Sequence, residues 1–478
     1  MRRLVLAAPV MALIFLMSSC PTDSGDSGTK NPYSGLASRQ FWAQDMSTPE
    51  SNYYTLNAVK LAEGQRCIVW AEKNAEVSVD TGKAIAKEYD NNIYSRITNL
   101  FGSDELMNFG DVDNNGKFTL LLLDIKDGYS SPGGAYTAGY FGSADLFSGT
   151  NSNKADMIYV DTYPSKLGSP ESYATIAHEL QHFINYVTSQ KKRPYLMDTW
   201  IDEGLSTAAE YIYLGGHDMS RVNRFIYSQT IAQGNNFFVW GEDKNVVLDE
   251  YSTAYLFFQW LRLQSGGTGI YRDIITSNYY DYRAVIGAIT GAFAAGLGTK
   301  TWENVLRTWF AANYINSANG IYGYKGDLPT VRVWAIGGST KYLLPGEGVY
   351  SVVGAASGTL PSGGGSHIKY AGLGKTPSPS VSVFTFPANG RLLTFNALDD
   401  WNQYAKDNYI NTVEGLRETG KLTGGAAETI PSASIAGNGR QAWRQPDSWV
   451  IDARDILGRR EREETAPIKL WSQDNGAE

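Results

Sequence analysis

Two histidines and a glutamate stand close together in the run His-Glu-Leu-Gln-His that begins at His178. On an α-helix, positions i and i+4 share one face, so the imidazoles of His178 and His182 can converge on one metal ion. Glu179 projects from the neighbouring edge of that face, where its carboxylate can take a proton from water without binding the metal. The chain has only 4 histidines, which argues against coincidence. The spacing therefore predicts a Zn²⁺ site with His178 and His182 as ligands and Glu179 as the general base.

A third ligand is needed, because catalytic zinc usually has three protein ligands and one position open to water. The segment Trp-Ile-Asp-Glu-Gly-Leu-Ser, from Trp200 to Ser206, follows the histidines. It resembles the second motif of the gluzincin peptidases, in which a tryptophan, an Asn-Glu-Gly or a close variant, and small residues follow one another. The resemblance implies that Glu203 is the third zinc ligand. His217 is an alternative ligand, but it lies outside any comparable motif.

Within the gluzincins, the resemblance is to the hyicolysin-type neutral metallopeptidases and covers roughly residues 60–330. It implies zinc-dependent hydrolysis of protein or peptide substrates. The sequence departs from the gluzincin pattern in two ways. Asp202 stands where Asn is common, and no Asp occurs four residues after Glu203, where some gluzincins place a partner for a zinc histidine. Glu210, further along the same helix, could substitute for that partner in a second shell around the metal.

Hydrolysis places negative charge on the carbonyl oxygen, so a hydrogen-bond donor should complete the site. In related gluzincins a tyrosine on a later helix serves this role, and Tyr251 matches its placement best. Tyr255 is the next candidate, and His217 is a weaker one. The Gly-x-Met-Glu-Asn segment of gluzincin aminopeptidases is missing, which favours an endopeptidase that binds an extended peptide beside an edge strand. Residues 156–162 are the strand expected to do this.

The first residues have the pattern of an export signal. Arg2 and Arg3 precede an apolar run over residues 4–17, which is too short to span a membrane, and small residues then precede Cys20. This order resembles the bacterial lipobox, in which the signal is removed and the new terminal cysteine carries lipid. We expect a signal peptide over residues 1–19 and a lipidated Cys20, with a plain secretory signal as the alternative. The protein would then be exported and anchored to a bacterial envelope membrane, at the outer membrane or the cell surface.

Charge and cysteine content narrow the possibilities further. The net charge is −8, and no block of Lys and Arg could follow a phosphate backbone, so nucleic acid is excluded as a partner. The 2 cysteines are Cys20 and Cys67. If Cys20 carries lipid, Cys67 has no partner, and its strand-like surroundings predict a buried and inert thiol.

The remaining pattern predicts an α+β protein. A zincin-like metallopeptidase domain, with a mixed sheet and a helical part, is expected over residues 38–330, after a flexible tether over residues 20–37. A β-sandwich-like domain is expected over residues 331–457 and a polar tail over residues 458–478. The periodicity predicts helices over 81–100, 172–189, 199–214, 252–263 and 301–312, and strands over 65–79, 118–125, 156–162, 331–336, 348–353, 381–386 and 392–395.

Residues 111–117, Asp-Val-Asp-Asn-Asn-Gly-Lys, resemble the start of a calcium-binding loop, with oxygens at alternate positions and Gly at the turn. The twelfth position is Leu122, where an EF-hand requires a bidentate Glu. The same residues form a good turn before a strand, and this is the interpretation that the sequence favours.

A second functional hypothesis is a surface lipoprotein that binds a host or envelope ligand through a zincin-like scaffold. A protein that had lost catalysis would be expected to lose Glu179 first, because this residue contributes chemistry but no metal bond. Its presence favours the enzyme.

Overall fold

The computed structural model describes residues 33–47, 52–130, 136–193, 195–235, 238, 244–336 and 343–399. The predicted signal peptide, Cys20, most of the predicted tether, the end of the predicted β domain and the polar tail lie outside these residues. The described residues from Leu36 onward belong to one compact unit.

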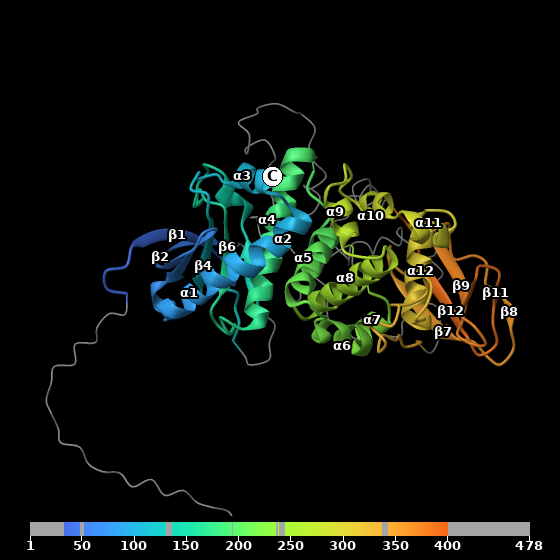
Figure 1. The fold of residues 1–478 in the computed structure, drawn as a ribbon. Helices are drawn as coiled ribbons and strands as arrows, with labels where there is room; N and C mark the ends of the chain where they lie inside the picture. The colour runs from blue at the N-terminus through green and yellow to red at the C-terminus, as the bar shows by residue number, and fades with distance from the viewer. Residues whose placement is uncertain are drawn as a thin grey trace, which may run out of the picture. The chain divides into compact units, whose positions relative to one another are not determined.

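A six-stranded mixed sheet forms the first part of the fold, in the strand order β1-β2-β3-β4-β6-β5 (Figure 1). The outer pairs β1-β2, β2-β3 and β5-β6 are antiparallel, whereas β3, β4 and β6 run parallel. Its strands are β1 (Ser38–Asp45), β2 (Asn52–Glu63), β3 (Cys67–Glu72), β4 (Phe118–Leu123), β5 (Gly139–Phe141) and β6 (Met157–Asp161).

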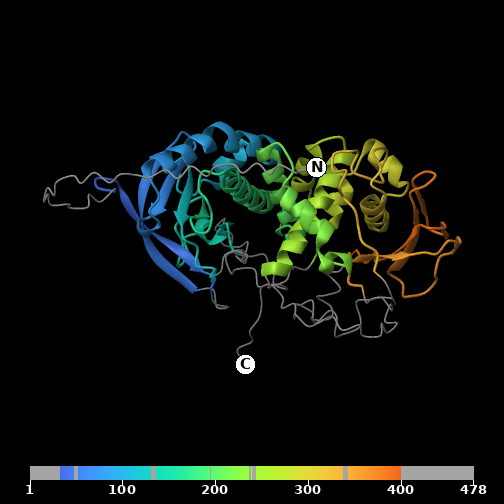
Figure 2. The ribbon, with the colours of Figure 1, turned by 90° about the horizontal axis from the view of Figure 1, so that it is seen from below.

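The middle strands β4 and β6 are buried on both faces of the sheet, as the unbroken apolar run of β4 predicts. The helices α1 (Val79–Glu88), α2 (Tyr94–Phe101) and α4 (Pro170–Lys192) pack along one face, with α1 on β2 and β3 and α4 on β5 and β6 (Figure 2). On the other face, Leu121 and Leu123 join a core with Phe41 of β1 and Tyr159 of β6. A short π-helical turn joins α1 to α2, where the sequence predicts one continuous helix.

Helices make up the middle of the chain, and the predicted helices are present among them. The short helix α3 (Asp104–Gly110) precedes β4. The later helices are α5 (Thr199–Leu214), α6 (Met219–Tyr227), α7 (Gln229–Ala232), α8 (Lys244–Gln264), α9 (Gly269–Ile275), α10 (Tyr282–Ala288), α11 (Gly291–Leu297) and α12 (Trp302–Ile315). Helix α5 packs on both α4 and α8, so it links the sheet side of the fold to the remaining helices.

The described residues after α12 form two small antiparallel sheets, and a sandwich is not confirmed among them. One sheet has the order β10-β9-β12-β7 and the other pairs β11 with β8. The strands are β7 (Gly348–Val352), β8 (Gly358–Thr359), β9 (Ile368–Gly374), β10 (Ser380–Ser382), β11 (Thr385–Phe386) and β12 (Arg391–Asn396). The strand predicted over residues 331–336 is wrong, because that segment has no regular structure.

The predicted substrate-binding edge strand is also wrong. Residues 156–162 do form a strand, β6, but β6 lies between β4 and β5 and pairs with both. Its backbone groups are therefore already engaged on each side. Among the described strands, the outer one at this end of the sheet is β5.

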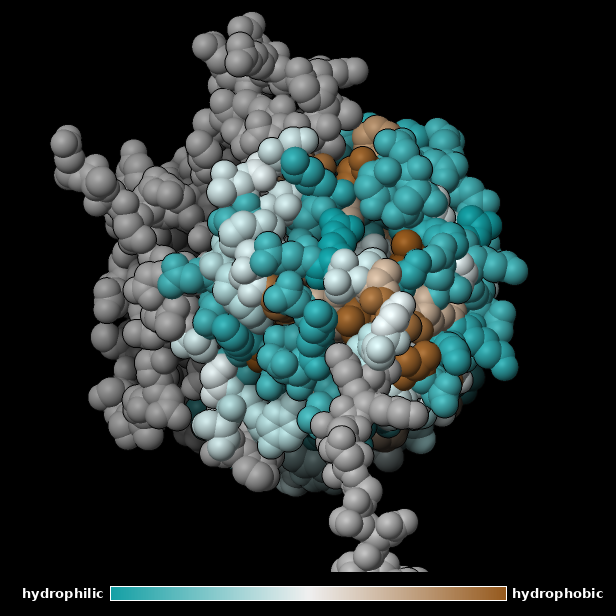
Figure 3. Space-filling model, turned by 90° about the vertical axis from the view of Figure 1, so that its left-hand side faces the viewer, coloured by the Kyte–Doolittle hydropathy of each residue, from teal (hydrophilic) through white to brown (hydrophobic). Residues whose placement is uncertain are grey.

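The surface beside β1 and β2 is mostly hydrophilic, interrupted by a small hydrophobic area (Figure 3). Among the described residues, no helix has the length and apolar character that crossing a bilayer requires.

Candidate metal centre

Helix α4 carries both candidate histidines and has clear boundary signals. The side chain of Ser169 accepts a hydrogen bond from the backbone N–H of Ser172, and Pro170 occupies the first turn. Lys191 and Lys192 lie in the last turn, where positive charge is favourable. Between these ends most of the helix is buried, so its central turns present their polar residues to the interior.

Helix α5 carries the candidate glutamate and is fixed in place by its packing. Trp200 is fully buried, and its ring contacts Phe258 of α8. The next turn approaches α8 so closely that a Cβ atom on Gly204 would overlap the ring of Phe258. Glycine is therefore required beside Glu203, because it lets α8 and α5 pack in direct contact. The tryptophan and glycine of the Trp200–Ser206 motif thus have a packing role.

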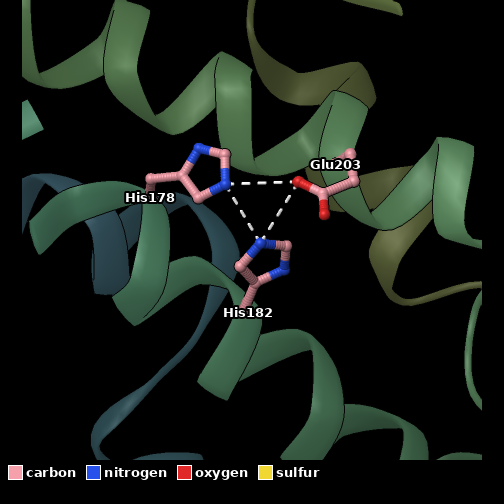
Figure 4. A group of neighbouring side chains, drawn as sticks. All are labelled: His178, His182 and Glu203. Atoms are coloured by element: carbon pink, nitrogen blue, oxygen red, sulfur yellow. Dashed lines mark hydrogen bonds and ion pairs between the residues drawn. The ribbon is translucent and has the colours of Figure 1, made fainter. Parts of the chain in front are cut away.

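The three predicted ligands converge between α4 and α5 (Figure 4). The Nε2 atoms of His178 and His182 lie 3.0 Å apart. The Oε2 atom of Glu203 lies 3.2 Å from the first nitrogen and 3.3 Å from the second. All three residues are buried, with 2–7% of their surface exposed. The candidate ligand atoms therefore form a nearly equilateral triangle inside the protein.

The dimensions and chemistry of this triangle fit zinc. Ligand atoms at about 2.0–2.1 Å from a tetrahedral ion lie about 3.3 Å from one another, which matches the observed separations. The Nδ1 atoms of both histidines face carboxylates and so carry the protons, which leaves lone pairs on Nε2. Oε2 of Glu203 is buried and finds no hydrogen-bond donor. Three buried ligand atoms that face one another are unfavourable unless positive charge, from bound protons or a metal ion, lies between them.

Each candidate histidine is oriented by a carboxylate on α5. His178 Nδ1 lies 2.7 Å from Glu210 Oε1, as the sequence suggested, and Arg221 of α6 donates to the same carboxylate at 2.7 Å. His182 Nδ1 lies 3.0 Å from Asp202 Oδ2. The sequence did not predict the role of Asp202 or that of Arg221. The position of Asp202 beside Glu203 was a usable signal, whereas Arg221 belongs to a different helix and has no local pattern.

The charged groups around the centre favour a bound cation. Burial lowers the pKa of His178, but its contacts with Glu203 and Glu210 outweigh burial and raise the pKa to about 9. Burial would raise the pKa of Glu203, but the two imidazoles hold it well below its usual range. Glu203, Glu210 and Asp202 thus place three carboxylates around two imidazoles, a distribution that a divalent cation would neutralise.

Glu179 lies beside the triangle and is not part of it. It is 5% exposed, and burial raises the pKa of its carboxyl above the usual range, while His178 and His182 oppose that shift. Strand β5 passes directly over this side chain. A Cβ atom on Gly139 would lie 3.1 Å from Cγ of Glu179 and 2.8 Å from Cγ2 of Thr175. Strand β5, one of the two outer strands of the sheet, therefore lies next to the candidate base.

Of the three candidate oxyanion donors, Tyr251 of α8 lies at the triangle. Its ring centroid is 6.2 Å from that of His178. Burial and the nearby carboxylates of Glu203 and Glu179 raise the pKa of Tyr251 well above its usual value, so its hydroxyl keeps the proton. His217 and Tyr255 form a separate network, in which Nδ1 of His217 lies 2.8 Å from the Tyr255 hydroxyl and Nε2 lies 3.0 Å from Asp327. The structure therefore does not place His217 among the ligands.

A buried His-His-Glu triangle on two packed helices beside a mixed sheet has the donor set of a catalytic zinc site, and zinc is the cofactor that these residues support. The chain is similar to the neutral metalloprotease ShpI of Staphylococcus hyicus, with 35% identity over 249 residues. The match covers 50% of this chain and 54% of that protein, so the chain spans about half the length of this relative. The predicted resemblance to neutral metallopeptidases is thereby confirmed. No family model matches the chain.

Proposed function

We propose that this protein is a zinc-dependent endopeptidase with His178, His182 and Glu203 as the metal ligands. The observation that carries the proposal is the buried triangle of ligand atoms from two histidines and one glutamate, with the carboxyl group of Glu179 next to it. The likeness to a neutral metalloprotease over half of the chain supports the same reaction class. Zinc held by these three residues would act as a Lewis acid toward a carbonyl oxygen and lower the pKa of a water molecule.

Glu179 is the proposed general base. Its carboxylate takes a proton from the water that attacks the scissile carbonyl carbon, and it passes this proton to the amide nitrogen as the C–N bond breaks. Burial raises the pKa of Glu179, which strengthens its carboxylate as a base for the first of these steps. The Tyr251 hydroxyl donates a hydrogen bond to the carbonyl oxygen as negative charge develops there.

Strand β5 is the proposed binding edge for the substrate backbone. It is one of the two outer strands of the described sheet, and it lies over Glu179. An extended peptide that paired with it would bring a backbone carbonyl close to the base, with chain continuing on either side. This arrangement suits cleavage within a polypeptide, so the substrates are proteins or peptides.

We also propose that the protein is lipid-anchored to a bacterial envelope membrane through Cys20. The sequence order of Arg2, Arg3, an apolar run and small residues before Cys20 supports this. The test is expression in a bacterial host, followed by extraction with a detergent that separates into two phases. The wild type should enter the detergent phase and Cys20→Ala should enter the aqueous phase; equal partition of the two proteins would refute the anchor.

The endopeptidase is tested by casein cleavage and zinc content, measured on the wild type, Glu179→Gln and Glu171→Gln. Glu171 lies exposed on the first turn of the same helix and serves as the matched control. We expect one zinc in each protein, cleavage by the wild type and Glu171→Gln, and a loss of at least about 10²–10⁴-fold in Glu179→Gln. Zinc binding without cleavage of casein or a mixed peptide library by the wild type would contradict the proposal and favour the ligand-binding lipoprotein.

A further inference from the structure

A loop of alternating oxygen-bearing residues connects α3 to β4. Asp111, Asp113 and Asn115 provide the oxygens, and Gly116 has a φ of 69° at the turn. The backbone N–H of Gly116 donates to Oδ2 of Asp111 at 2.9 Å, and the side chain of Asn115 donates to Oδ2 of Asp113 at 2.7 Å. These contacts are those of the turn that the sequence favoured. They leave further lone pairs on both carboxylates.

A third carboxylate reaches this loop from a distant part of the chain. Asp156 directly precedes β6, and its carbonyl oxygen accepts a hydrogen bond of 2.9 Å from the backbone N–H of Thr119 in β4. Pairing between β4 and β6 therefore fixes Asp156 beside the loop. Carboxylate oxygens of Asp111, Asp113 and Asp156 all lie within 4.8 Å of one another.

Asp156 differs from the two loop residues because its carboxyl group is buried and one of its oxygens has no hydrogen-bond donor. Its exposed fraction is 4%, and its Oδ1 atom has no hydrogen-bond partner. Burial, with a contribution from the charges of Asp111 and Asp113, raises the pKa of its carboxyl to about 9. A buried acidic oxygen without a partner is costly, and protein interiors normally provide a donor or a cation for such a group.

No described Lys or Arg forms an ion pair with any of the three carboxylates. Lys117, the nearest in sequence, pairs with Glu63 at 2.7 Å. Arg66 lies 3.8 Å from Asp104. A small cavity of about 30 Å³ is lined by Asp111 and Asp156, and Lys117 and Arg66, which pair with other carboxylates, also lie on its wall. Asp113 lies within 4.8 Å of the other two carboxylates but does not line this cavity. This volume exceeds the roughly 10–15 Å³ that one water molecule needs, so the cavity has room for an ion.

We propose that Asp111, Asp113 and Asp156 form a second metal site, separate from the zinc centre, that binds Ca²⁺. The donors are all carboxylate oxygens, which select hard cations over zinc. Oxygens on opposite sides of a Ca²⁺ ion are about 4.6–5.2 Å apart, and this span accommodates the observed cluster. Mg²⁺ demands near-ideal octahedral geometry and usually keeps several water ligands, so a cluster of protein carboxylates suits Ca²⁺ better. Water molecules and loop carbonyls complete the coordination.

The site would join two segments that meet only in the folded sheet. The loop lies at the start of β4, and Asp156 lies at the start of the neighbouring strand β6. Bound Ca²⁺ would therefore stabilise the native pairing of these strands, because the unfolded chain cannot bring the three carboxylates together. The inference does not depend on the proposed peptidase activity.

The test measures calcium binding to the zinc-loaded full-length protein in two ways. Isothermal titration calorimetry gives the affinity, and thermal unfolding gives the midpoint with and without about 1 mM Ca²⁺, a concentration typical of extracellular calcium sites. The variants are Asp156→Asn and Asp113→Asn, with Asp80→Asn as the control. Asp80 is exposed on α1 and pairs only with Lys83. We expect Ca²⁺ to raise the midpoint of the wild type and of Asp80→Asn by several degrees. We expect both cluster variants to bind Ca²⁺ at least about tenfold more weakly.

Zinc content is measured in every sample, so that displacement of zinc cannot be mistaken for calcium binding. A wild type that shows neither binding heat nor a change in midpoint would overturn the proposal. So would Asp156→Asn and Asp113→Asn variants that respond to Ca²⁺ as the wild type does. If Asp156→Asn does not fold, Asp113→Asn decides the question, because Asp113 is partly exposed and its replacement leaves the core intact.

Discussion

The Oε1 atom of Glu210 lies 2.7 Å from Nδ1 of His178, although the two residues are 32 positions apart and belong to different helices. The same carboxylate accepts hydrogen bonds from Arg221, which fixes its orientation. The chain His178–Glu210–Arg221 therefore determines which imidazole nitrogen faces Glu203. The position of His178 depends on the packing of three helices, α4, α5 and α6.

The two carboxylates that orient the histidines should control zinc affinity. Glu210→Gln and Asp202→Asn each remove a negative acceptor from an imidazole N–H, and we expect each to weaken zinc binding by about 10–100-fold. The measurement is competition for zinc with a chromogenic chelator, and Glu171→Gln is the control that should match the wild type. Unchanged affinity in both variants would show that these contacts do not orient the ligands.

Replacement of the tyrosine at the metal centre should affect the rate and not the metal. Tyr251→Phe removes the hydroxyl that is proposed to bind the developing oxyanion, so we expect kcat to fall by about 10²–10³-fold with zinc content unchanged. Tyr255→Phe is the matched control, because the Tyr255 hydroxyl contacts His217. It should lower kcat much less. A similar loss in both variants would assign the effect to helix packing.

The close approach of β5 to α4 leaves no room for a side chain at Gly139. A Cβ atom there would lie 2.8 Å from Thr175 Cγ2 and 2.9 Å from the carbonyl oxygen of Tyr159. We expect Gly139→Val to destabilise the protein by about 1–3 kcal/mol and to lower kcat/KM for casein by at least about tenfold. Gly149→Ala is the control, since no atom lies within 4 Å of its added Cβ. Chemical denaturation and initial rates would measure both effects, and a Gly139→Val variant with wild-type kinetics would argue against binding along β5.

The buried carboxyl of Asp145 should give the protein an unusual dependence on pH. Burial raises its pKa from 3.8 to about 6, against hydrogen bonds from Tyr159 and Asn153 that lower it. Between these two pKa values the folded state binds more protons than the unfolded state, so this group's contribution to stability falls as pH rises from about 4 to about 6. The full change is on the order of 3 kcal/mol.

The measurement is the free energy of unfolding of the wild type and of Asp145→Asn between pH 4 and about 7, compared as a difference at each pH. Subtraction removes the contributions of the other carboxylates. The wild type should lose stability relative to the variant as pH rises. A difference that is flat with pH, or that grows in favour of the wild type, would contradict the raised pKa.

Local patterns in the sequence predicted much of this molecule. Helical periodicity predicted α4, α5 and α12 to within a few residues, and the unbroken apolar run predicted β4 as a buried strand. The i, i+4 spacing predicted that His178 and His182 share one helix face. The position of Glu203 came from resemblance to a family motif, and the structure places this residue at the triangle. These features depend on neighbours in the chain or on a short motif.

Features that depend on contacts between distant segments could not be predicted in the same way. The order of strands in the sheet decides which strands are outermost, and the local pattern of residues 156–162 does not reveal that they lie between two neighbours. Asp156 meets Asp111 and Asp113, which lie far from it in the sequence. Glu210 contacts His178, which is 32 positions away, and Arg221, which belongs to another helix. The strand expected over residues 331–336 had the required residue types but forms no regular ladder, although the backbone N–H of Ile336 donates to the carbonyl oxygen of Tyr350 in β7.

Cys67 also has a consequence for experiments on this protein. Its side chain is fully buried between β3 and α1, where its sulfur lies 3.9 Å from the carbonyl oxygen of Ala86, and burial raises the pKa of the thiol far above its usual value. A maleimide or disulfide reagent can react with this sulfur only after the sheet has opened. In a Cys20→Ser background, the rate of Cys67 labelling would therefore report how often native molecules open, and no engineered cysteine is needed.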